Sequence, residues 1–158
     1  MRVGVTGHSN LTEATEQLVY DALRDLLGRY DGDLVGVTCL ARGADQIFAR
    51  AVLDSGGRVE VILPAPDYRD AKVKPDNLAE FDDLLGRASS VRYTGHATSG
   101  RQAYMAASKM LLESVDRLVA VWDGLPAGGY GGTGDVVEHA RKIGVPVDVV
   151  WPDGAERQ

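Results

Sequence analysis

The sequence has little cysteine and no long apolar run. Cys39 is the single cysteine among 158 residues, which excludes an intrachain disulfide and a cysteine metal cluster. No apolar stretch approaches the roughly 18 residues that a membrane-spanning helix needs, so we expect no membrane partner. The first residues lead directly into a short expected strand, without the layout of a signal peptide. These features predict a soluble, cytoplasmic protein.

Metal-ligand spacing is also missing. His8, His96 and His139 do not have the spacing of a metal site, and Cys39 has no paired ligand. We therefore expect neither a metal nor another cofactor.

Basic residues are outnumbered by acidic ones. The chain has 17 Lys and Arg against 23 Asp and Glu, a formal net charge of −6. General nucleic-acid binders need clustered Lys and Arg against the phosphates, so this charge argues against a nucleic-acid partner. A small anionic ligand is not excluded, because a local site can be positive on an acidic protein.

Short apolar runs alternate with segments of helical periodicity. The expected strands are 2–6, 34–38, 58–63, 90–93, 116–122 and 144–151. Expected helices include one capped by Asn10 or Thr12 and ending near Arg29, and others at 47–53, 77–87, 101–114 and 135–142. Between them, residues 67–74 are polar and are expected to form an exposed connection.

Such alternation is typical of parallel strands joined by right-handed crossovers. The sequence therefore predicts an α/β fold: a single-domain Rossmann-like three-layer α/β/α domain with a mainly parallel sheet. We expect this domain to cover residues 1–151 and to bind a nucleotide, with 152–158 as a polar C-terminal tail.

Residues 122–135 stand out because six of the eleven residues from Gly124 to Gly134 are glycine. The segment follows an apolar strand and precedes a helix, and glycines in that position let backbone N–H groups approach an anion. A flexible surface loop is the alternative interpretation.

Three turns are expected at one edge of the sheet, since each follows a strand: 7–9, 41–45 and 123–135. Ligands of open parallel sheets bind at this edge, so we predict a nucleotide site there. The candidate binding residues are Gly7, His8, Ser9, Arg42, Gly43, Asp45, Gly129, Gly131, Gly132 and Thr133.

Several candidates have a structural alternative. Arg42 could pair with phosphate, or bridge to Asp45 or a surface carboxylate. His8 could donate to a phosphate or ribose, or satisfy loop carbonyls. Asp135 could cap its helix, or bind ribose hydroxyls and assist glycosidic chemistry.

Aromatic residues could complete the site. Trp122 and Tyr130 could stack on a base, although Trp122 could equally belong to the core. Tyr68, in the polar connection, is a candidate lid residue.

Two segments resemble known families. Residues 39–64, which begin Cys-Leu-Ala-Arg-Gly-Ala-Asp, resemble the nucleotide-binding domain of the DNA-processing protein A (Smf) family. Residues 116–122, with the following Gly-Gly-Tyr-Gly-Gly-Thr, are similar to the "Lonely Guy" (LOG) cytokinin-activating phosphoribohydrolases and to lysine-decarboxylase-like proteins. Together they resemble the SLOG superfamily, which implies a Rossmann-like fold that binds nucleotides at the glycine loop.

The LOG resemblance also implies cleavage of the N-glycosidic bond of nucleoside 5′-monophosphates, through Pro-Gly-Gly-x-Gly-Thr-x-x-Glu and an arginine in the preceding helix. Here the place of the glutamate falls on Val136, with Asp135 one position early and Glu138 two late. The place of the arginine falls near Ala107, and residues 124–127 lengthen the loop.

Three functions are therefore open. The first is binding or sensing of a nucleotide-derived small molecule. The second is a nucleoside-phosphate hydrolase in which Asp135 or Glu138 assists and Arg42 or Arg101 holds phosphate. The third is DNA binding, against which the net charge argues. A homodimer is a further possibility.

Overall fold

The computed structural model describes residues 1–127 and 132–158 and contains one parallel sheet. The strand order is β4-β3-β2-β1-β5-β6, and every neighbouring pair is parallel. The strands are β1 (Arg2–Gly7), β2 (Val35–Thr38), β3 (Arg58–Leu63), β4 (Ser90–Tyr93), β5 (Arg117–Val121) and β6 (Val147–Val150). The expected parallel α/β sheet is thus confirmed.

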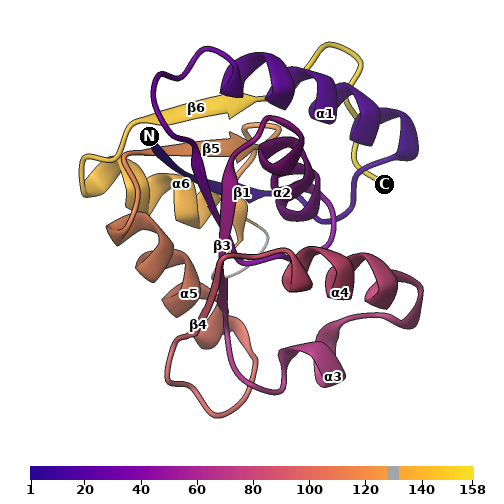
Figure 1. Cartoon of the computed structure of the whole chain (residues 1–158), viewed down its shortest axis with the longest axis vertical. Coiled ribbons are helices and arrows are strands. Elements are labelled where there is room, and N and C mark those ends of the chain that lie inside the picture. The colour runs from indigo at the N-terminus through magenta and orange to yellow at the C-terminus, as the bar shows by residue number, and fades with distance from the viewer. Residues whose placement is uncertain (128–131) are drawn as a thin grey trace.

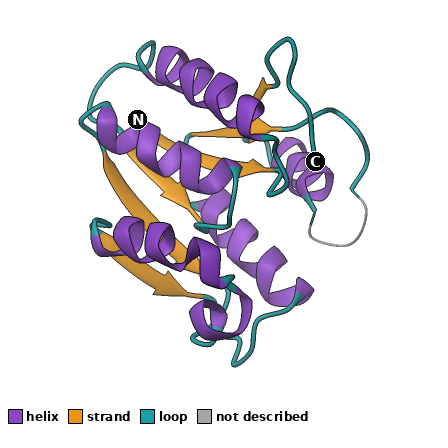
Figure 2. Cartoon of the chain, turned by 90° about the vertical axis from the view of Figure 1, so that its right-hand side faces the viewer, coloured by secondary structure: helices purple, strands orange, loops and turns teal. Residues whose placement is uncertain are grey.

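Helices cover both faces of the sheet and make a three-layer, Rossmann-like domain (Figure 1). They are α1 (Glu13–Leu27), α2 (Ala44–Asp54), α3 (Tyr68–Lys72), α4 (Leu78–Gly86), α5 (Arg101–Glu113) and α6 (Thr133–Lys142), with a 3₁₀ turn at Pro75–Asn77. On one face lie α1, α2 and α4, which stand in front of the strands in Figure 2, and on the other lie α5 and α6.

The buried residues form two clusters, one on each face of the sheet. The first joins the inner sides of α1, α2 and α4 to the strands and contains Phe48 and Phe81, both fully buried. The second lies under α5 and α6 and contains Leu111 and Leu118. Because helices cover both faces, a central strand such as β2 is buried along all four residues, and its sequence is continuously apolar up to Thr38.

The first helix begins where the sequence predicts. Thr12 is the N-cap of α1, and its hydroxyl accepts a hydrogen bond from the backbone N–H of Thr15 at 3.2 Å. Val19, Leu23 and Leu27 then recur every four residues and pack on the core.

The connection at 67–74 is mostly exposed, as expected, with residues 69–72 and 74 open to solvent, but Tyr68 is not. Tyr68 starts the short helix α3 and is buried, with its ring 5.9 Å from that of Phe81 and 6.2 Å from that of Tyr104. Burial of a large aromatic side chain stabilises the segment, although the residues around it are polar.

The last residues pack back on the domain. Leu11 and Arg157 form an antiparallel bridge, and the Gln158 N–H donates to the carbonyl of Asn10 at 2.6 Å. This contact places the C-terminal segment beside the turn that follows β1. The division into a domain at 1–151 and a tail stays a prediction.

Among the described residues, no helix combines the length and the apolar character that crossing a bilayer would require.

Candidate ligand-binding site

The strand order reverses at β1. From β1 the chain builds outward through β2, β3 and β4, and then returns to add β5 and β6 on the other side of β1. In open parallel sheets, such a reversal leaves a crevice outside the carboxyl ends of the two strands, and ligands bind in it.

A pocket of about 740 Å³ opens at this reversal. It is lined by residues from the turns after β1, β2, β3 and β5, from α3 and α5, and from the start of α6. Its volume lies in the range of small-molecule sites, roughly 300–1,000 Å³. The three turns predicted to meet at one sheet edge therefore share one pocket.

Most of the candidate residues line this pocket. Those that do are Gly7, His8, Ser9, Arg42, Asp45, Gly132 and Thr133. Gly129 and Gly131, with Tyr130, lie outside the described residues. Neither Asp135 nor Glu138 is among the lining residues, and Glu138 is exposed on α6.

Gly7 and Gly43 hold the turns after β1 and β2 close together. A Cβ on Gly7 would lie 2.4 Å from that of Ala44, and one on Gly43 would lie 2.7 Å from the carbonyl oxygen of His8. The Ala44 N–H donates to that same carbonyl at 3.1 Å. Gly43 therefore does not line the pocket, but it allows the two turns that do so to pack closely together.

The charge of the lining is the reverse of the charge of the chain. Arg42, Lys72, Lys74 and Arg157 line the pocket, whereas Asp45 is the one carboxyl among the described lining residues. Two of the four, Arg42 and Arg157, are themselves paired with Asp76 and Asp123. Lys72 and Lys74 therefore carry the excess positive charge of the lining, on a protein of net charge −6.

Arg42 is held at the rim by Asp76. Its two terminal nitrogens donate to the two carboxylate oxygens of Asp76 at 3.2 and 3.0 Å, a bidentate pair that lowers the pKa of Asp76. Of the alternatives open for Arg42, the structure shows the bridge to a surface carboxylate. The pair is exposed, so an incoming phosphate can compete with Asp76 at little free-energy cost.

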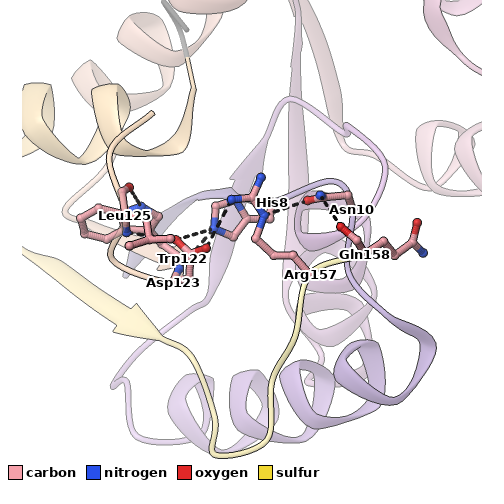
Figure 3. A network of polar contacts seen from close by, with 7 residues as sticks. All are labelled: His8, Asn10, Trp122, Asp123, Leu125, Arg157 and Gln158. Carbon is pink, nitrogen blue, oxygen red and sulfur yellow. Dashed lines mark hydrogen bonds and ion pairs between the residues drawn. The ribbon is translucent and has the colours of Figure 1, made fainter. Parts of the chain in front are cut away.

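His8 is buried between the turns after β1 and β5 (Figure 3). Its backbone N–H donates to the Val121 carbonyl at 3.1 Å, and its side-chain Nε2 accepts from the backbone N–H of Asp123 at 3.2 Å. The imidazole ring meets the Trp151 ring edge-on, with 5.6 Å between the ring centroids. Burial lowers the pKa of His8, with a further contribution from Arg157. Nε2 also lies 3.2 Å from Oδ1 of Asp123, so the imidazole is held against that carboxylate.

Arg157 reaches the same place from the end of the chain. It donates through Nε to the side chain of Asn10 at 3.2 Å and pairs with Asp123 at 3.3 Å (Figure 3). Burial acts to raise the pKa of Asp123, but hydrogen bonds from the Leu125 N–H and Arg157 outweigh it, and the pKa is lowered. Asp123 is therefore ionised and anchors Arg157 at the pocket.

Asp45 is the buried carboxyl of the pocket. It is 7% exposed, and Oδ2 accepts from the Ala41 N–H at 3.2 Å. Burial raises the pKa of Asp45 to about 7, well above that of an exposed carboxyl.

The start of α6 closes the pocket on the β5 side. Gly132 is the N-cap of α6 and has no side chain with which to cap it, and Gly132, Thr133 and Gly134 line the pocket. The N–H groups of a first helical turn and the helix dipole favour an anion at such a position. Trp122 also lines the pocket; its Nε1 donates to the Leu125 carbonyl at 2.8 Å.

Sequence reasoning missed three of the basic lining residues. Lys72 and Lys74 lie in the segment expected to be an exposed connection, and Arg157 lies in the expected tail. The run of basic residues at 69–74 was a usable signal for the two lysines, whereas Arg157 carries none in the sequence.

No protein-family model matches the chain, and a comparison with curated proteins gives no match. Solved structures do match. DNA processing protein A (DprA) from Streptococcus pneumoniae superposes with a TM-score of 0.71 at 18% identity, over 97% of this chain and 51% of that one. The chain thus spans about half the length of that protein.

Two further structures are similar. DNA processing protein A from Helicobacter pylori, solved for its single-stranded DNA binding mode, has a TM-score of 0.66 at 16% identity, over 100% of this chain and 68% of that one. The structural-genomics target TM1055 has a TM-score of 0.59 at 20% identity, over 92% of this chain and 71% of that one.

At these identities the likeness shows the fold. The fold implied by the SLOG resemblance is confirmed, and DNA processing protein A, which residues 39–64 resemble, is among the similar structures.

Proposed function

We propose that the protein binds a nucleotide or a nucleotide-derived phosphorylated ligand in the pocket between the ends of β1 and β5. The observation that carries this proposal is the reversal of charge: four basic side chains line one pocket of an acidic chain. A phosphate is the anion that best matches such a lining, because guanidinium and ammonium groups form charge-assisted hydrogen bonds to its oxygens.

The rest of the lining suits a nucleoside. Tyr104 and Trp122 supply aromatic surface for a base, and the start of α6 supplies backbone N–H groups for a phosphate. The volume of about 740 Å³ is ample for a mononucleotide.

Hydrolysis of the N-glycosidic bond needs an acid or base within reach of the ligand. The carboxyls that the sequence suggested for this role, Asp135 and Glu138, do not line the pocket. Asp45 and His8 do line the pocket and are the acid–base groups left for such a step. We propose binding as the function, and release of a free base is measured in the same experiments as the alternative outcome.

Titration calorimetry with the four ribonucleoside 5′-monophosphates and inorganic phosphate tests the proposal. We expect at least one nucleotide to bind more tightly than phosphate alone. Arg42→Ala should weaken that binding about tenfold, because a hydrogen bond to a charged group contributes about 1.5–3 kcal/mol.

Arg87→Ala is the matched control, since Arg87 is equally exposed and is paired with Asp83, but it is the C-cap of α4 and lies outside the pocket lining. Its binding should equal that of the wild type. Absence of heat with every nucleotide, or equal loss in both variants, would refute the proposal. Chromatography of the mixtures reports any free base.

A further inference from the structure

Asp45 stands out because its carboxyl is buried without a cation. It lies in the first turn of α2 and lines the pocket with 7% of its surface exposed. Its basic neighbour in sequence, Arg42, turns away to pair with Asp76. Among the described residues, no ion pair is formed to Asp45.

The protein itself satisfies only part of this carboxyl. Oδ2 accepts one hydrogen bond, from the Ala41 N–H at 3.2 Å. A carboxylate can accept about four hydrogen bonds, so acceptor capacity is left over on the side of the pocket. Burying a carboxyl with so few partners costs free energy, and the raised pKa of about 7 reflects that cost.

The leftover acceptor capacity calls for donors on the ligand. A phosphate supplies them poorly, because its second ionisation, with a pKa of about 6, leaves mostly the dianion near pH 7 and its charge repels a carboxylate. Hydroxyl groups can supply them, and the two vicinal hydroxyls of a ribose present two donors side by side.

We propose that Asp45 is a specificity-determining residue whose carboxylate accepts hydrogen bonds from the ribose hydroxyls of the ligand, so that the pocket selects ribonucleotides over deoxyribonucleotides. This inference rests on the proposed function. The basic lining residues then hold the phosphate, and Asp45 recognises the sugar.

Binding is then coupled to ionisation of Asp45. Hydrogen bonds from hydroxyls stabilise the carboxylate, so the ligand lowers the pKa of Asp45 from about 7 and a proton is released. The other groups of the pocket that titrate or carry charge are His8, Cys39, Arg42, Tyr68, Lys72, Lys74, Tyr104 and Arg157. Burial raises the pKa of Cys39 and of Tyr68, so both stay neutral near pH 7.

The test compares ribonucleotides with their 2′-deoxy counterparts by calorimetry, in buffers of different ionisation enthalpy, at about pH 6.5 where most Asp45 is protonated. The wild type should bind the ribonucleotide about tenfold or more tightly, since a hydrogen bond to a charged group is lost with the deoxy sugar. It should also release more protons with the ribonucleotide than with the deoxy form.

Asp45→Asn is the decisive variant. Asparagine keeps an acceptor for the Ala41 N–H but cannot ionise, so the preference should fall to a few-fold and the sugar-dependent proton release should disappear. The second ionisation of the phosphate, with a pKa of about 6, contributes equally to both proteins and cancels in the comparison.

Asp54→Asn makes the same change on the same helix at an exposed residue outside the pocket lining, and it should behave as the wild type. Equal wild-type binding of the two sugars would overturn the inference and leave the proposed function standing. If Asp45→Asn kept the wild-type preference for the ribonucleotide and the wild-type proton release, the inference would likewise be overturned and the proposed function would stand. Absence of any nucleotide binding would overturn both.

If circular dichroism shows that Asp45→Asn does not fold, the calorimetric comparison of the two sugars on the wild type still tests the inference. A ribose preference accompanied by extra proton release supports the inference, and its absence overturns it.

Discussion

At the scale of single residues, Gly43 holds the pocket together. Its backbone has φ +86° and ψ −124°, a conformation that residues with a Cβ rarely adopt. An added Cβ would also lie 2.7 Å from the His8 carbonyl oxygen and 2.8 Å from the Cα of Ser9. Both neighbours are backbone atoms, so relief requires the turn after β1 to move.

Gly43→Ala should therefore destabilise the protein by about 3 kcal/mol, the sum of backbone strain and overpacking. Gly56→Ala is the matched control: Gly56 has φ +82° at the end of α2, and nothing lies within 4 Å of its added Cβ. Gly56→Ala should lower the free energy of unfolding by the backbone strain alone, about 1–2 kcal/mol. Urea denaturation measures both, and equal losses would show that the close approach is unimportant.

At the scale of elements, α3 connects stability to the site. Its five residues make too short a helix to be stable alone, and Tyr68 fixes it by packing between Phe81 and Tyr104. The same helix ends at Lys72, two residues before Lys74, and both lysines line the pocket. Burial of one aromatic ring thus positions two of the four basic side chains.

Tyr68→Ala should lose about 3 kcal/mol or more of the free energy of unfolding, as is typical for a buried aromatic residue. Tyr93→Ala makes the same change at a residue that is 49% exposed on the edge strand β4, and should cost less than about 1 kcal/mol. Urea denaturation again compares them. Similar losses in the two variants would mean that Tyr68 does not hold α3.

At the scale of the whole molecule, the basic pocket lies within an acidic chain. The formal net charge of −6 includes all four basic lining residues, so the remainder of the chain is more negative still. A mononucleotide meets only the pocket, whereas a long polyanion meets the acidic surface as well. A homodimer and a cytoplasmic location stay predictions.

We therefore expect no retention of a single-stranded oligodeoxynucleotide in a gel shift at physiological ionic strength of about 0.15 M. The same preparation should bind a mononucleotide, which serves as the control for a working pocket. The similarity in fold to DNA processing protein A of Helicobacter pylori makes this test necessary. Retention of the oligonucleotide would favour DNA binding over the function that we propose.

The sequence by itself determined the alternation of strands and helices, the parallel sheet and the place of Arg42, Asp45 and Thr133 at its carboxyl edge. These features follow from local periodicity and from the geometry of parallel strands, which a single chain segment already displays.

Only the tertiary structure decided which side chains meet there. Arg157 reaches Asp123 across 34 positions of the sequence, Arg42 finds Asp76 rather than Asp45, and Tyr68 is buried within a polar segment. Burial and ion pairing depend on the distance in space between residues that are remote in sequence, and no local pattern encodes that distance.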